Sequence, residues 1–213
     1  MYTKEQLRRL LIPLMFEQVL TALMGSVDTI MVTNIGSAAI SAVSLVDSLN
    51  ILIINVFAAM ATGGAIICAQ YLGSNQKDKA NQALKQLIFS VTLISILITI
   101  PCIVFRRPLL TLIFGSVEKS VMDNSLSYLY ITALSYPFIA LYNAAAASFR
   151  TSQNSILPMA IAFGSNILNI VGNIFFIFTL SLGVAGAAIS TLLSRIVSAL
   201  IILILLKQPK QDL

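Results

Sequence analysis

Residues 10–32 read LLIPLMFEQVLTALMGSVDTIMV, a mainly apolar stretch that contains two acids, Glu17 and Asp28. A helix of this length can cross the hydrocarbon core of a bilayer. The acids are 11 positions apart, close to three helical turns, so both lie within about 20° of one line along the helix. A carboxylate inside a membrane costs about 3 kcal/mol on insertion scales. Two acids on one stripe therefore predict a water-accessible surface that binds protons or cations.

The composition of the whole chain is typical of a membrane protein. Its 213 residues are 58% hydrophobic and only 10% charged, and there is no His. Without His, any proton or ion handling falls to carboxylates, amides and hydroxyls. We find no nucleophile–base pair or metal cluster that indicates an enzyme, and we expect no cofactor apart from a coupling ion. The net charge of +5 comes without a basic run longer than a pair, which argues against nucleic acid as a partner.

Apolar blocks follow one another along almost the whole chain. Six of them are about 20 residues or longer, the length that a membrane helix requires. They leave no room for a soluble domain, so we expect an all-α membrane protein with six transmembrane helices. The predicted spans are residues 10–32, 45–71, 84–105, 125–147, 158–180 and 183–206.

Lys and Arg residues predict the orientation of these helices. The segments on one side of the membrane carry nine of them, and the segments on the other side carry three. By the positive-inside rule, we expect both termini in the cytoplasm and a multi-pass protein of the cell membrane, plasma or inner. The nine are Lys4, Arg8, Arg9, Lys77, Lys79, Lys85, Arg150, Lys207 and Lys210, and the three are Arg106, Arg107 and Lys119.

Polar side chains recur at helical spacing in the last two predicted spans. Three Asn residues fall within about 60° of one face of the fifth span, and hydroxyl residues repeat that spacing in the sixth, beside Arg195. Amide and hydroxyl oxygens suit a small hard cation, and Asp28 would supply the charge. Alternatively, these side chains are hydrogen-bond partners between helices, and Arg195 pairs with an acid or reaches the cytoplasmic surface. The residues are Asn166, Asn169, Asn173, Thr191, Ser194 and Ser198.

The second predicted span opens with Asp47 and Asn50, one helical turn apart and close to the predicted outer surface. Both are candidates for a substrate cavity or a proton path, as is Glu17 nearer the cytoplasmic end of the first span. An acid at the start of a helix is also favoured by the helix dipole. Asp47 therefore has an ordinary explanation as a solvated surface residue.

The fourth predicted span holds a cluster of aromatic and polar side chains. Tyr136 and Asn143 are seven positions apart and share a face, with Tyr142 beside them. Aromatic rings with polar tips suit a cavity for planar amphipathic cations, and they suit plain packing equally well. Pro137 would free a backbone carbonyl one turn earlier in the helix.

Short motifs follow one another from the first to the sixth span. They are Pro13 with VDTIMV at 27–32, GGA at 63–65, AQYLG at 69–73, KDKA at 77–80, LNI at 168–170 and LGVAGAA at 182–188. In order and separation, this set resembles the multidrug and toxic compound extrusion (MATE) transporters. No single motif is decisive, but the ordered set is fairly specific.

The resemblance implies a cation-coupled antiporter that exports organic, often cationic and amphipathic, drugs or toxic compounds through two six-helix lobes arranged in a V. The N-terminal lobe of such transporters binds Na⁺ or H⁺ through an Asp of the first helix, two polar residues of the fifth and a Thr of the sixth. These positions correspond to Asp28, Asn169, Asn173 and Thr191. Some members have Asp in place of Asn173, and Glu17, about 16 Å along the helix from Asp28, is a candidate for a second charge.

The chain has the length of one such lobe. The resemblance implies a second six-helix lobe, supplied within the membrane lipid by a missing C-terminal half, a partner chain or a second copy. Two alternatives stay open. One is a flippase for lipid intermediates, for which Arg195 would be the only base inside the membrane. The other is a non-transporting scaffold or a truncated remnant.

Overall fold

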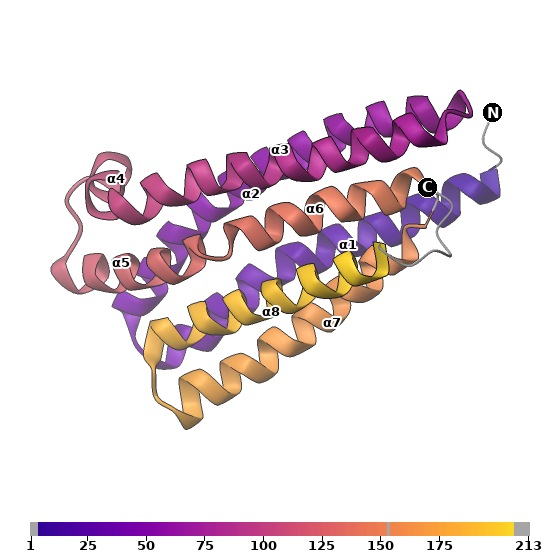
Figure 1. The fold of residues 1–213 in the computed structure, drawn as a ribbon. Helices are drawn as coiled ribbons and strands as arrows, with labels where there is room; N and C mark the ends of the chain where they lie inside the picture. Colours follow the sequence, from indigo (N-terminus) through magenta and orange to yellow (C-terminus); the bar gives the residue numbers. More distant parts are fainter. Residues whose placement is uncertain (1–3, 153, 207–213) are drawn as a thin grey trace.

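The computed structural model describes residues 4–152 and 154–206, and every regular element in these two ranges is a helix (Figure 1). Lys207 and Lys210, which contribute to the predicted orientation, lie outside the described residues. The elements are α1 (Lys4–Met31), the 3-10 helix η1 (Val32–Asn34), α2 (Ser37–Gly73), α3 (Lys77–Val104), α4 (Arg106–Phe114), α5 (Lys119–Ala133), α6 (Tyr136–Thr151), α7 (Ile156–Asn173), the π-helix η2 (Ile174–Thr179) and α8 (Gly183–Leu206).

Within the described ranges, five helical segments are long and apolar enough to cross a membrane. Helices α5 and α6 together make a sixth, which is bent by 45°. The predicted all-α membrane fold is therefore confirmed, with a fourth span that is broken in two. The five single segments are Leu11–Asn34, Ser37–Gly73, Lys77–Val104, Ile156–Thr179 and Gly183–Leu206.

The break in the fourth span lies around Ser135, two residues before Pro137. In an unbroken helix the Pro137 ring would clash with the carbonyl of Ala133, which would also lose its intrahelical partner. The Ala133 carbonyl instead lies 3.4 Å from the Thr99 hydroxyl of α3. At the break itself, the Ser135 hydroxyl accepts a hydrogen bond of 2.7 Å from Arg195 of α8. The break thus receives polar support from two neighbouring helices.

Helix α2 begins at Ser37 rather than at Leu45. The prediction that Asp47 opens this helix is therefore wrong, because Asp47 lies almost three turns inside it. The helix extends toward its N-terminus because small and apolar side chains there continue its buried face at helical spacing. These side chains are Ala39, Ala42, Val43 and Val46.

A short helix, α4, occupies the segment between α3 and α5, where only a loop was expected. Pro108 lies in its first turn, a position that tolerates the missing N–H group of proline. Leu110 anchors the helix because its side chain is only 1% exposed. The Arg106 guanidinium lies 5.1 Å from the centre of the Tyr130 ring of α5, a cation–π contact that ties the two helices together.

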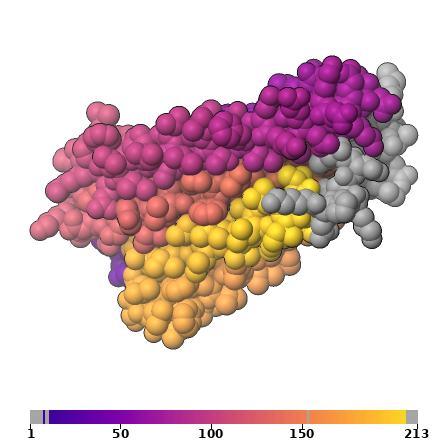
Figure 2. Space-filling model, in the orientation of Figure 1, coloured from indigo at the N-terminus to yellow at the C-terminus, as the bar shows by residue number. Residues whose placement is uncertain are grey.

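The helices run lengthwise along an elongated bundle, and α1 begins at the end of the bundle where α8 finishes (Figure 1). Helix α1 packs mainly on α7, α2 on α3, α5 and α6, and α8 on α5, α6 and α7. In Figure 2, α3 borders one long edge of the visible face, and α7 and α8 border the other. Large apolar side chains are exposed on these helices, among them Phe89, Leu97, Phe163 and Ile204. Such a surface suits contact with lipid hydrocarbon.

The hairpin between the last two spans brings the helices into backbone contact. A Cβ atom on Gly186 of α8 would lie 2.9 Å from the backbone of Phe176, at the end of the preceding span. That separation is shorter than real Cβ contacts allow, so glycine is required for this approach. The small residues of the 182–188 motif therefore act by letting two helices pack closely.

Candidate functional site

Asp28 lies on α1, and only 1% of it is exposed. Its Oδ1 accepts a hydrogen bond from Asn173 Nδ2 at 2.7 Å, and its Oδ2 accepts one from the Thr191 hydroxyl at 2.6 Å. The Tyr128 hydroxyl lies 3.4 Å from the same Oδ2. These donors belong to α7, α8 and α5, so four helices meet at one carboxylate. The donors offset the cost of placing a carboxylate away from water.

Asn169 of α7 joins this network through Thr191 and Asn173. Its amide nitrogen donates to the Thr191 hydroxyl at 3.1 Å, and its side-chain oxygen accepts from Asn173 at 3.3 Å. Asn173 Oδ1 is buried and has no hydrogen-bond partner. The structure thus brings together the four residues predicted for the cation site. Their carboxylate, amide and hydroxyl oxygens are the donor set that a small hard cation requires.

Asp47 of α2 lies on the other side of the Tyr128 hydroxyl. Its Oδ1 is 3.2 Å from that hydroxyl and accepts a hydrogen bond of 3.1 Å from the Asn50 amide. The Tyr136 hydroxyl in turn donates to Asn50 Oδ1 at 2.7 Å. Asp47 Oδ2 is buried and has no hydrogen-bond partner. Because a phenol carries one proton, Tyr128 can donate to either Asp28 or Asp47 but not fully to both.

A cavity of about 260 Å³ lies beside both acids, with walls from α1, α2, α5, α6, α7 and α8. Arg195 also lines the cavity. It forms no ion pair with any residue in the described ranges, so the pairing with an acid that the sequence suggested is not seen. Its guanidinium donates to Ser135 instead. The polar lining residues are Gln18, Thr21, Asp28, Asp47, Asn50, Asn55, Tyr128, Tyr142, Ser165, Asn166, Thr191, Arg195 and Ser198.

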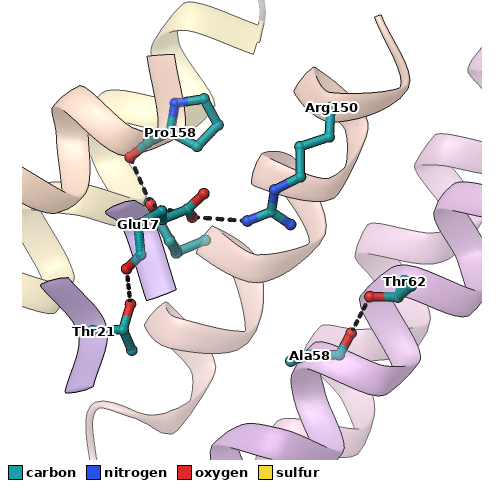
Figure 3. A network of polar contacts seen from close by, with 7 residues as sticks. Glu17, Thr21, Ala58, Thr62, Arg150 and Pro158 are labelled. Atoms are coloured by element: carbon teal, nitrogen blue, oxygen red, sulfur yellow. Dashed lines mark hydrogen bonds and ion pairs between the residues drawn. The ribbon is translucent and has the colours of Figure 1, made fainter. Parts of the chain in front are cut away.

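Glu17 lies on the same helix as Asp28 but belongs to a separate polar network (Figure 3). Its Oε1 forms an ion pair of 2.8 Å with Arg150 of α6. The Tyr142 hydroxyl is 3.1 Å from that same oxygen and 2.9 Å from the Pro158 carbonyl of α7. Glu17 is 2% exposed and is not among the residues that line the cavity. The carboxylate therefore joins α1 to α6, and the Tyr142 hydroxyl extends the network to α7.

Two other residues predicted for the substrate cavity or a proton path also lie away from the cavity lining. Tyr136 is fully buried and is engaged with Asn50. Asn143 is partly buried, and its amide nitrogen has no hydrogen-bond partner. Tyr142, next to Asn143, is the member of the fourth-span cluster that does line the cavity.

Sequence reasoning missed Tyr128, which reaches Asp28 from 100 positions away. No helical periodicity connects these two residues, because they lie on different helices. The contact depends on how α5 packs against α2 and α8, and the sequence carries no direct signal of that packing.

A family model described as MatE matches residues 13–175. The chain belongs to the MATE family. The matched range contains Asp28, Asp47, Asn169 and Asn173, and it covers more than half of the chain. As a MATE protein, this chain is a multi-pass membrane protein from a family of transporters rather than enzymes.

Similar MATE proteins align with almost all of this chain. The uncharacterized transporter YisQ of Bacillus subtilis (strain 168) is 30% identical over 202 residues, which make up 92% of this chain and 44% of YisQ. The probable multidrug resistance protein NorM of Thermotoga maritima is 25% identical over 203 residues, or 92% of this chain and 43% of NorM. The chain therefore spans less than half the length of each of these relatives.

Solved structures show the same relation. A crystal structure of MATE in the bent conformation matches with a TM-score of 0.93 at 25% identity, over 99% of this chain and 47% of that protein. An outward-facing multidrug resistance MATE transporter matches with a TM-score of 0.88 at 25% identity, over 96% of this chain and 45% of that protein. This MATE chain thus has the fold of one six-helix lobe.

Proposed function

We propose that this chain forms one lobe of a cation-coupled antiporter that exports organic, mainly cationic and amphipathic compounds. The observation that carries the proposal is the buried Asp28 carboxylate, which accepts hydrogen bonds from Asn173 and Thr191 beside a cavity. In this proposal Na⁺ or H⁺ binds at Asp28 with the nearby side-chain oxygens of α7 and α8, and the substrate enters the cavity. Coupling requires that each ligand bind two arrangements of the lobe with different affinities.

The charges around the cavity support a cationic substrate. Asp28 and Asp47 line it, and Arg195 is the one base among the lining residues that the structure describes. When both acids are ionised, one negative charge therefore remains. NorM of Thermotoga maritima and MepA of Staphylococcus saprophyticus, which is 24% identical to this chain, are named as multidrug resistance and multidrug export proteins. Their names agree with export of drug-like compounds.

A transport path between two lobes requires a second lobe. The chain spans less than half the length of the relatives compared above, so we propose that a second six-helix lobe faces it in the plasma or inner membrane. The rest of a longer protein, a partner chain or a second copy would supply that lobe. Because α1 starts and α8 finishes at one end of the bundle, two such lobes can be related by an axis along the membrane normal (Figure 1).

The substitution Asp28→Asn tests the proposal in everted membrane vesicles from cells that express this chain together with the second lobe that the transport path requires. Vesicles with the wild-type chain are expected to accumulate ethidium when either Na⁺ or H⁺ is concentrated inside them. D28N vesicles should lose this gradient-driven accumulation, because an amide keeps the shape of the carboxylate but carries no charge for the cation. Ethidium fluorescence follows the accumulation directly.

Asp123→Asn is the matched control, because Asp123 lies exposed on α5 and does not line the cavity. D123N vesicles should accumulate ethidium as the wild type does. The proposal is contradicted if D28N vesicles match the wild type, or if wild-type vesicles accumulate no dye under either gradient.

A further inference from the structure

We propose that Asp47 binds the positive charge of the substrate, at a position separate from the cation site at Asp28. The inference rests on the proposed export function and adds to it the side chain that recognises the substrate. The ligand class is an organic monocation that carries apolar or aromatic groups. The argument depends on the free acceptor of Asp47, the charges around it and the shape of the cavity.

Asp47 has a carboxylate oxygen that no donor occupies. Its Oδ1 accepts from Asn50 and lies near Tyr128, whereas its Oδ2 is buried without a partner. Asp28, by contrast, uses both oxygens in hydrogen bonds of 2.7 Å and 2.6 Å. Asp47 Oδ2 lies opposite Gly25 of α1, which has no side chain. A Cβ atom at Gly25 would be 3.8 Å from that oxygen, an ordinary van der Waals contact. A buried acceptor without a partner is costly, and a bound cation would remove that cost.

The groups that face Asp47 allow one positive charge to bind. They are Asp28 on α1, Tyr128 on α5, Tyr136 on α6 and Arg195 on α8. The phenols are neutral in ordinary conditions. Two ionised acids and one guanidinium therefore leave a single negative charge, which one monocation balances.

Glu17 is the other buried acid of α1, and it does not suit this role. Its carboxylate is already paired with Arg150 at 2.8 Å, so it carries no unbalanced charge. It is also absent from the lining of the cavity. Of the two acids considered beside Asp28, only Asp47 both lines the cavity and has a carboxylate oxygen without a hydrogen-bond partner.

The cavity is suited to the charged part of an amphipathic cation. Its volume of about 260 Å³ is slightly below the range of about 300–1,000 Å³ that is typical of small-molecule sites. The lobe therefore holds the cationic group and its nearest atoms, while the rest of a larger substrate extends from the cavity. Met24, Ile51 and Ile54 provide apolar walls, and the aromatic residues Tyr128 and Tyr142 also line the cavity, a composition that suits an ammonium group.

Binding of phenyltrimethylammonium to the full chain in detergent micelles tests the inference, with isothermal titration calorimetry as the readout. This probe has one fixed positive charge and one aromatic ring. Asp47→Asn should weaken its affinity by about tenfold or more, because the substitution removes the opposite charge from a poorly solvated cavity. Asp47→Glu keeps the charge and should retain affinity within about threefold of the wild type.

Asp123→Asn serves as the control, because it removes an acid outside the cavity. D123N should bind the probe as the wild type does, and thermal unfolding will show that each variant is folded. The role of Asp47 is overturned if D47N binds the probe with wild-type affinity. It is also overturned if D47E loses as much affinity as D47N, or if the wild-type chain binds no probe. The two proposals fail separately, because gradient-driven accumulation that survives D28N contradicts the export function, whereas probe affinity that survives D47N contradicts only the substrate contact.

Discussion

At the scale of single residues, Thr191 determines how the cation site is ordered. Its hydroxyl accepts a hydrogen bond from Asn169 and donates one to Asp28, so its single proton is directed at the carboxylate. Helical periodicity and the family resemblance selected Asp28, Asn169, Asn173 and Thr191 from the sequence, because Asn169 and Asn173 lie four positions apart on one helix face. The contacts between helices could not be predicted in this way, since periodicity describes each helix alone.

Thr191→Val tests the contribution of that hydroxyl to stability. Valine has nearly the same shape but removes the nearest donor of Asp28 Oδ2 and the nearest acceptor of the Asn169 amide. These groups keep only longer contacts, with the Tyr128 hydroxyl at 3.4 Å and the Ser190 hydroxyl at 3.5 Å. We expect a loss of about 1–3 kcal/mol in the free energy of unfolding, the usual cost of unsatisfied buried polar groups. Equilibrium unfolding of the purified chain in mixed micelles measures this difference. Thr191→Ser retains the hydroxyl and should lose much less, so equal losses in the two variants would argue against the hydrogen-bond chain.

At the scale of helices, the two buried acids of α1, Glu17 and Asp28, have different roles. Asp28 faces the cavity, whereas Glu17 anchors α1 to α6 through Arg150 (Figure 3). The stripe formed by the two acids was visible in the sequence, but their separate partners were not, because Arg150 lies on another helix. In the fourth span, Pro137 predicted a freed carbonyl. The 45° bend could not be predicted, since hydropathy measures the length of a span and not its direction.

Glu17→Gln tests the anchoring of α1. The substitution leaves the Arg150 charge partly buried and unpaired, with 23% of its side chain exposed. We expect a loss of about 3 kcal/mol in the free energy of unfolding, at the low end of the range for breaking a buried ion pair, because solvent screens part of the charge. Urea unfolding in mild detergent is a suitable measurement. Asp123→Asn removes an exposed acid and should change stability little, and a Glu17→Gln variant as stable as D123N would mean that the ion pair does not hold α1.

At the scale of the whole molecule, composition and span length were enough to predict a six-span helical membrane protein. The extra helix α4 and the early start of α2 were not predicted, because both elements depend on tertiary burial of residues such as Leu110 and Val43. The resulting lobe places an acid-lined cavity beside four helices that meet at Asp28. Ligands that bind only the folded lobe will stabilise it.

Ion-dependent thermal unfolding of the full chain in detergent micelles is the most direct test of the claim that Asp28 and its polar partners bind the coupling cation. The wild type, D28N and D123N are compared as NaCl replaces choline chloride at constant ionic strength, and separately as the pH is lowered. The account predicts that the unfolding temperatures of the wild type and D123N change in the same way with Na⁺ or with pH. The unfolding temperature of D28N should lack that change. The same responses to both ions in the wild type and in D28N would contradict it.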